Sequence, residues 1–198
     1  MTGDPRIPRA PGLLPDDGVL HAPDKPQLRR LLKEARRAID PSTKRSWDDR
    51  IGARVVAWAR EHAIDVLGVY WPLAGEPDLR PAYAELAEAG VRLALPVVVA
   101  RDAALGFAEW VPGEATVADS MGIAVPSDLR MIARPSALLI PCLGFDARGY
   151  RVGYGGGFYD RTLEAEPRPK TVGIAYVCQQ VDFEIGEYDI PLDRMITE

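Results

Sequence analysis

The sequence predicts an α/β fold of three layers, a largely parallel sheet with helices on both faces. Short apolar stretches, typical of buried strands, alternate along the chain with segments whose apolar residues recur every three or four positions. The helix that connects two parallel strands packs back onto a face of the sheet, so this alternation favours a parallel sheet over an antiparallel one.

The first helix is expected to begin near residue 25. Its apolar residues recur at helical spacing from Leu28 to Ile39, and three cations are expected to form a basic stripe on the other side: Arg29, Lys33 and Arg36. Asp40 and Pro41 end this helix and can cap the next, because proline fits the first position of a helix. The second helix carries Trp47, Ile51, Val55 and Trp58 on one side.

A third helix is expected over residues 79–89, ended by Gly90, and a fourth from Tyr159 to about Glu166. The expected strands span residues 66–71, 91–99, 105–111, 137–140 and 171–178. Cys142 and Cys178 fall in such apolar stretches, so we expect both to be buried structural thiols. Two cysteines make neither a metal cluster nor a disulfide framework.

The composition is that of an ordinary globular domain. The 198 residues are 47% hydrophobic and 27% charged, with a formal net charge of −5. The acidic balance argues against nucleic acid as a partner, and no apolar run is long enough to cross a membrane. Prolines among charges indicate a disordered or loosely packed extension over residues 1–24, before a single α/β domain over residues 25–198. A cytoplasmic location is the default expectation.

The segment from Gly149 to Arg161 carries the strongest functional signal. Four glycines within five residues, Gly153 and Gly155–Gly157, let the backbone approach a ligand closely. Arg151 and Arg161 flank them with guanidinium groups suited to phosphate, and Asp160 adds an oxygen ligand suited to Mg²⁺. The spacing matches neither a P-loop nor a dinucleotide motif, so the alternative is a simple tight turn.

Glu76 follows one expected strand, and the glycine-rich segment follows another. Ligands of open α/β sheets bind beyond the carboxyl ends of the strands, so we expect both at one site on that edge.

The run Leu138–Arg161 resembles the signature of the 5-formyltetrahydrofolate cyclo-ligases, also called methenyltetrahydrofolate synthetases. Weaker similarities at residues 25–29, 70–78, 188–193 and 196–198 extend the resemblance over about residues 25–198. It implies a Rossmann-like scaffold, similar to that of sugar isomerases and coenzyme A transferases. It also implies ring closure of 5-formyltetrahydrofolate, with or without a polyglutamate tail, to 5,10-methenyltetrahydrofolate at the expense of ATP, with Mg²⁺.

The resemblance also implies roles for individual residues. The ATP-binding set would be Lys25, Arg29, Arg151, Gly153, Tyr154, Gly155, Gly156, Gly157, Phe158, Tyr159 and Arg161. Glu76, Trp71, Tyr154 and Tyr159 would contact the folate, and Asp160 and Asp189 would bind Mg²⁺. Catalysis would rest on Arg151, Tyr154 and Tyr159.

Each of these roles has a plainer alternative. Lys25 and Arg29 could belong to a solvated basic face, and Glu76 could be an exposed loop residue. Asp160 could cap its helix, and Asp189 could be a turn residue. The chain departs from the family pattern at Cys142, where a glycine is usual, and in the regions of Met121 and Val125.

Two other functions remain open at this level. One is an enzyme of different chemistry on a similar scaffold, such as a sugar-phosphate isomerase, which would need a central carboxylate base and no ATP. The other is a non-catalytic protein that binds nucleotide or folate as a regulator. We expect a monomer or a weak homodimer.

Overall fold

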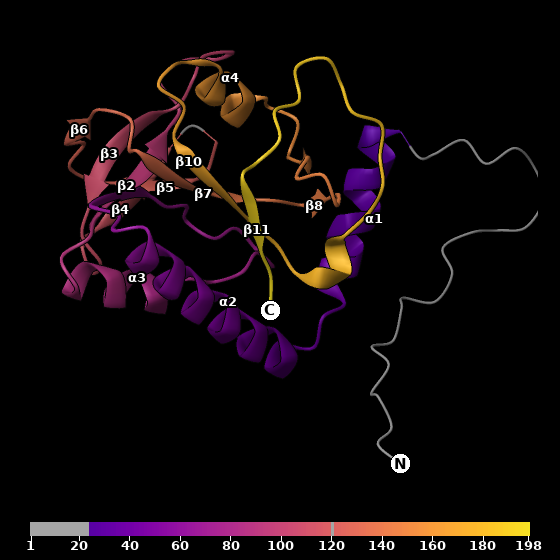
Figure 1. Ribbon diagram of the computed structural model, residues 1–198, viewed down its shortest axis with the longest axis horizontal. Helices are drawn as coiled ribbons and strands as arrows, with labels where there is room; N and C mark the ends of the chain where they lie inside the picture. The colour runs from indigo at the N-terminus through magenta and orange to yellow at the C-terminus, as the bar shows by residue number, and fades with distance from the viewer. Residues whose placement is uncertain (1–23, 120) are drawn as a thin grey trace, which may run out of the picture.

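The structure is a computed structural model that describes residues 24–119 and 121–198 (Figure 1). The expected extension over residues 1–24 therefore lies, apart from Asp24, outside the described residues. Four α-helices occur in the described part: α1 (Lys25–Arg37), α2 (Pro41–Glu61), α3 (Arg80–Glu88) and α4 (Phe158–Glu164). None of the helices in residues 24–119 and 121–198 is long and apolar enough to span a bilayer.

Side-chain caps set the starts of the first two helices. The Asp24 carboxylate accepts a hydrogen bond of 2.8 Å from the backbone N–H of Gln27 at the start of α1. Asp40 accepts from the N–H groups of Ser42 and Thr43 at 2.9 and 3.0 Å, with Pro41 as the first residue of α2. The cap expected at Asp40 and Pro41 is therefore confirmed.

The central sheet has seven strands in the order β11-β10-β7-β1-β2-β3-β6. Neighbours among the first five strands are parallel, and β3 and β6 continue the sheet in antiparallel pairing. The expected α/β fold with a largely parallel sheet is thus confirmed, with an antiparallel edge. In sheet order the bounds are β11 (Arg194–Ile196), β10 (Lys170–Ile174), β7 (Ala137–Pro141), β1 (Val66–Gly68), β2 (Arg92–Val97), β3 (Gly106–Trp110) and β6 (Met131–Ile132).

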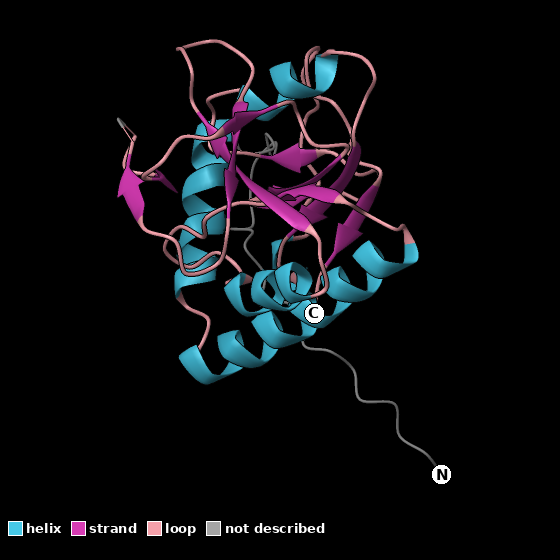
Figure 2. Ribbon diagram, turned by 90° about the vertical axis from the view of Figure 1, so that its left-hand side faces the viewer, coloured by secondary structure: helices cyan, strands magenta, loops and turns pink. Residues whose placement is uncertain are grey.

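Helices lie on both faces of this sheet. In Figures 1 and 2, α2 and α3 run along one face, and α4 lies over the other. Strand β7 divides its side chains accordingly: Leu139 packs in the core under α2 and α3, while Leu138 and Ile140 pack with Leu163 of α4. A smaller cluster seats α1 through Leu28 and Leu32.

The sequence did not indicate two short hairpins. They are β4 (Thr116–Ala118) with β5 (Ala124–Pro126), and β8 (Gly144–Phe145) with β9 (Arg151–Val152). The strand expected over residues 171–178 ends at Ile174, and a short 3₁₀ helix, η1 (Val177–Gln179), follows. Cys178 lies in η1 and is exposed, so the expectation of a buried thiol is wrong there, whereas Cys142 is buried.

Candidate active site

A cavity of about 740 Å³ opens at the carboxyl ends of β1, β2 and β7. Tyr70 and Trp71 line it just after β1, Val98 just after β2, and Pro141 at the end of β7. The parallel strands end at one edge of the sheet, which is why segments far apart in the sequence meet here. The cavity is lined by all the residues to which we assigned roles: Lys25, Arg29, Trp71, Glu76, Arg151, Gly153–Arg161 and Asp189.

The glycine-rich segment is shaped by the β8–β9 hairpin and by two arginines. Gly155 and Gly157 have φ values of +98° and +64°, which side chains other than glycine rarely adopt. The Arg29 Nε of α1 donates to the Gly153 carbonyl at 2.9 Å. Arg161 donates to the Gly156 carbonyl at 2.5 Å, and its guanidinium lies 5.2 Å from the centre of the Phe158 ring. Both arginines therefore brace the loop while lining the cavity.

Two ion pairs join the cations and carboxylates of the site. The Arg151 Nη2 lies 2.6 Å from Asp160 Oδ1, and its Nη1 donates to the Ile190 carbonyl at 2.8 Å. The Lys25 Nζ lies 2.5 Å from Asp189 Oδ2, which also accepts from the Gly186 N–H. Lys25 is thus paired with a carboxylate rather than simply solvated. Among the described residues, Asp160 accepts hydrogen bonds only from Arg151 and from the Ile190 N–H, so it does not cap α4.

These two carboxylates are the candidate ligands for a metal ion at the phosphate end of the cavity. Within the described residues, no three His, Cys, Asp or Glu side chains form a group that could hold a metal by themselves. Mg²⁺ beside a nucleotide needs no such cage, because it usually takes one or two carboxylates together with phosphate oxygens and water. The donor set of Asp160 and Asp189 fits that kind of Mg²⁺ and no dedicated protein-only site.

Glu76 is buried at the wall of the cavity, with only 2% of its surface exposed. Its Oε2 accepts from the Leu73 N–H at 2.7 Å, and its Oε1 accepts a short hydrogen bond from the Tyr154 hydroxyl. The alternative of an exposed loop glutamate is therefore wrong. A carboxylate offers about four acceptor positions, so two remain for donors of a ligand.

The two tyrosines of the glycine-rich segment keep their protons over the working range of pH. Burial, reinforced by the negative charge of Glu76, raises the pKa of both Tyr154 and Tyr159 well above the usual value. The guanidinium of Arg36 opposes this rise at Tyr154, and that of Arg151 opposes it at Tyr159. Both hydroxyls are therefore hydrogen-bond donors and not bases.

Trp71 joins the cavity to the core. Its ring lines the cavity and meets the ring of Trp110 edge-on at 5.7 Å. On the loop side, the Arg80 guanidinium lies 5.5 Å from the centre of the Trp71 ring. The indole is thus held between the sheet and α3, and it forms a rigid apolar part of the wall.

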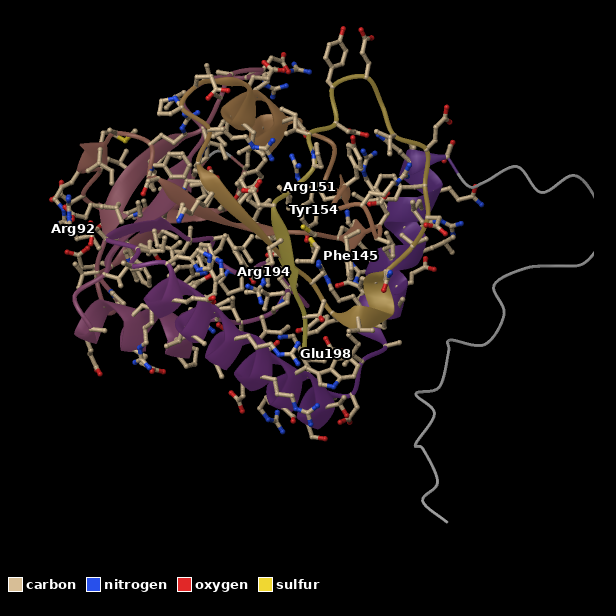
Figure 3. The ribbon with its side chains drawn as sticks, in the orientation of Figure 1. Arg92, Phe145, Arg151, Tyr154, Arg194 and Glu198 are labelled. Carbon is tan, nitrogen blue, oxygen red and sulfur yellow. The ribbon has the colours of Figure 1, made fainter. Side chains whose placement is uncertain are left out.

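Arg36 is buried, which the sequence pattern did not predict. The basic stripe was expected on the side opposite the apolar residues, but Arg36 is 5% exposed and lies with Leu28 and Leu32 on the buried side of α1. The signal was available, because residues 28, 32 and 36 share one face of a helix at i, i+4 spacing. Arg36 contacts Tyr154. Figure 3 shows Tyr154, together with Arg151, between α1 and the strands of the sheet.

Two further segments complete the wall of the cavity. Pro96 and Val98 reach the cavity from the end of β2, and Asp119, Met121 and Ile123 reach it from the β4–β5 hairpin. Met121 departs from the family pattern, and it is exposed and contributes an apolar side chain to the wall of the cavity.

The fold and this cavity define an α/β enzyme whose site combines a glycine-rich loop, arginines and a buried carboxylate at the carboxyl edge of a parallel sheet. The chain belongs to the 5-formyltetrahydrofolate cyclo-ligase family, whose sequence profile matches residues 21–198. The resemblance found in the Leu138–Arg161 run and the enzyme class that it implied are confirmed.

Individual relatives agree with this assignment. The 5-formyltetrahydrofolate cyclo-ligase of Escherichia coli K12 is 32% identical over 175 residues, which cover 84% of this chain and 96% of the relative. That of Mycoplasma pneumoniae is 28% identical over 179 residues, covering 88% and 99%.

Solved structures show the same fold. A 5,10-methenyltetrahydrofolate synthetase from Mycoplasma pneumoniae superposes with a TM-score of 0.74 at 26% identity, covering 88% of this chain and 98% of that one. A methenyltetrahydrofolate synthetase from Aquifex aeolicus gives a TM-score of 0.75 at 24% identity, covering 87% and 88%.

Proposed function

We propose that this chain converts 5-formyltetrahydrofolate to 5,10-methenyltetrahydrofolate in a reaction that consumes ATP, requires Mg²⁺ and releases ADP and phosphate. Membership of the cyclo-ligase family supports the reaction. The observation that carries the proposal is that one cavity is lined both by the glycine-rich loop with its arginines and by the buried carboxylate of Glu76.

At one end of the cavity, the triphosphate would lie against the glycine-rich loop. Lys25, Arg29, Arg151 and Arg161 supply four cations, and Gly153–Gly157 let the backbone approach the phosphates. Phe158, whose ring lies under the Arg161 guanidinium, would bound this end. The protein has a net charge of −5, so affinity for an anion has to come from such local positive charge.

At the other end, Glu76 would recognise the amino-pyrimidine edge of the pterin. Its two remaining acceptor positions suit the paired N–H donors of that edge. Trp71 would give an apolar wall beside the ring, Tyr159 would donate to the formyl group, and the ring of Tyr154 would stack on the pterin.

In the chemical step, the formyl oxygen attacks the γ-phosphorus of ATP, and ADP leaves with the bond electrons. N10 then attacks the activated formyl carbon and loses its proton, while the electron pair of N5 helps to expel inorganic phosphate. Both nucleophiles belong to the substrates, so the protein acts by positioning and by stabilising charge, with Arg151 nearest the transferred group.

Asp160 and Asp189 would hold the Mg²⁺, which when bound neutralises charge on the phosphate oxygens. Both carboxylates are paired with cations of the same site, Arg151 and Lys25. We propose that the triphosphate takes over these two cations and thereby frees both carboxylates for the metal.

Three further features belong to this proposal. Arg30, Lys33 and Arg37 of α1 lie beside the cavity and would bind the carboxylates of a polyglutamate tail. The free cysteines fit the reducing cytoplasm. The protein would act as a monomer or a weak homodimer.

The experiment is to mix the protein with Mg²⁺-ATP and 5-formyltetrahydrofolate and follow absorbance at the methenyl-folate band. Asp160→Asn should lower the rate at least about 100-fold. The control Asp49→Asn, an exposed position on α2, should keep the wild-type rate. A flat trace from folded wild-type protein that still binds ATP would overturn the proposal.

A further inference from the structure

Arg36 is a buried cation, although the helical pattern predicted it on the side of α1 opposite the apolar residues. It lies on the inner face of α1, and only 5% of its surface is exposed. In the described part of the chain, no carboxylate forms an ion pair with it. A buried arginine without a paired acid is costly unless hydrogen bonds and nearby charge compensate it, so its contacts should indicate its purpose.

The contacts of Arg36 lead to the candidate active site. Its Nη2 donates to the Tyr154 hydroxyl at 2.8 Å, and its guanidinium lies 5.9 Å from the centre of the Tyr154 ring. Its Nη1 is buried and has no hydrogen-bond partner among the described residues. Its stem passes Gly75, where an added Cβ would come within 3.4 Å of Nε. One side chain of α1 therefore touches both the glycine-rich loop and the loop that carries Glu76.

These contacts fix the direction of the hydrogen bonds. A guanidinium can only donate, and a phenol has a single proton. Because the Tyr154 oxygen accepts from Arg36, its proton is directed to the Glu76 carboxylate, which can only accept when ionised. The three side chains form one chain of donors that runs from Arg36 through Tyr154 to Glu76, and the charge at one end balances the charge at the other.

We propose that Arg36 is a positioning residue for the folate end of the active site. It does not line the cavity, so it would act through Tyr154, by holding the hydroxyl against Glu76 and thereby fixing the orientation of the carboxylate. This inference rests on the proposed function, because it assigns to Glu76 the recognition of the pterin.

The acceptor positions of the Glu76 carboxylate would then be divided between the protein and the ligand. Leu73 and Tyr154 occupy one acceptor position on each oxygen of Glu76, and the remaining two would accept from donors of the ligand. Without Arg36, the Tyr154 hydroxyl is free to rotate, and Glu76 loses the positive charge that balances it. The loss should fall on folate affinity much more than on nucleotide affinity.

The test is a double-mutant cycle with Arg36→Gln and Tyr154→Phe, read by calorimetric binding of 5-formyltetrahydrofolate without ATP. Arg36→Gln should weaken binding about 10-fold in the wild-type background and less than about twofold in the Tyr154→Phe background. The matched control is Arg50→Gln, which removes an exposed cation of α2 away from the cavity and should leave binding unchanged. Affinity for a non-hydrolysable ATP analogue should change less than about threefold in Arg36→Gln.

Equal losses in the two backgrounds, or wild-type binding by Arg36→Gln, would overturn the role of Arg36. If Arg36→Gln does not fold, Arg36→Lys replaces it in the cycle with the same expected pattern, because a lysine keeps the buried charge but not the planar geometry. Wild-type protein that binds no 5-formyltetrahydrofolate would overturn the proposed function itself, and this inference with it.

Discussion

The hydroxyl of Tyr154 donates a hydrogen bond to the carboxylate of Glu76, although the two residues are 78 positions apart in the chain. Tyr154 belongs to the glycine-rich loop between β9 and α4, and Glu76 to the loop after β1. The bond therefore joins the proposed phosphate end of the cavity to its proposed folate end, so the two substrates would share one preformed wall.

Glu76→Gln should raise the KM for 5-formyltetrahydrofolate about 100-fold and leave the KM for ATP within about threefold. Two hydrogen bonds to a charged acceptor are weakened, each worth about 1.5–3 kcal/mol. Steady-state kinetics with each substrate varied in turn would show this. Glu164→Gln, an exposed acid on the cavity rim, is the control, and an equal loss there would mean that only the total charge matters.

Asp189→Asn should bind metal-free ATP about fivefold more tightly than the wild type. The substitution frees Lys25 from its ion pair and removes a negative charge that repels the triphosphate. At the same time it should weaken Mn²⁺ binding in the presence of an ATP analogue, measured by electron paramagnetic resonance. Glu187→Gln, an exposed neighbour, should change neither quantity. Unchanged binding of metal-free ATP in Asp189→Asn would contradict the proposal that the triphosphate replaces Asp189 as the partner of Lys25.

Gly155→Ala should weaken ATP binding and lower the free energy of unfolding by about 1–2 kcal/mol, since the residue has φ +98°. Its added Cβ would also come within 3.3 Å of the Arg29 guanidinium carbon. In Gly153→Ala the new Cβ has no neighbour within 4 Å, so the free energy of unfolding should change by less than about 0.5 kcal/mol. Urea denaturation of both variants measures the difference, and equal values would refute the strain at Gly155.

One of the two thiols should react with a thiol-specific reagent in the native protein, and both after denaturation. Cys178 is exposed in η1, whereas Cys142 is buried below the cavity. Burial also raises the pKa of Cys178, so its reaction should be slower than that of a free thiol at the same pH. Cys178→Ser should abolish the native reaction, and a persistent signal in that variant would mean that Cys142 is accessible.

The stability of the protein should fall with rising pH in part because of Cys142. Burial raises the pKa of this thiol to about 12 from a usual 9.0, so between those values the folded state keeps a proton that the unfolded state releases. This contribution is fully present below pH 9 and decreases by about 1.4 kcal/mol per pH unit above it.

Cys142→Ala tests this prediction. The variant should be less stable than the wild type near pH 8 because it leaves a small void, and the gap should narrow between pH 9 and 10. Denaturant titrations at several pH values measure it, before the buried tyrosines begin to ionise. A gap that is constant over this range would show that the thiol ionises equally in both states.

Much of this protein follows from local patterns in the sequence. The cap at Asp40, the helical spacing of α1 and α2 and the short apolar strands depend on near neighbours, and they were sufficient for an α/β fold. The glycine-rich segment is likewise local, because its spacing and flanking arginines are contiguous. These features were sufficient to recognise the family.

Tertiary structure decided how these pieces meet. The antiparallel edge of the sheet, the burial of Glu76 and the exposure of Cys178 depend on which segments pack together, and periodicity carries no such information. The burial of Arg36 shows the physical reason most clearly. A cation on a helix is expected in water, and only the approach of Tyr154 and its bond to Glu76, from two distant loops, gives the buried charge its compensation.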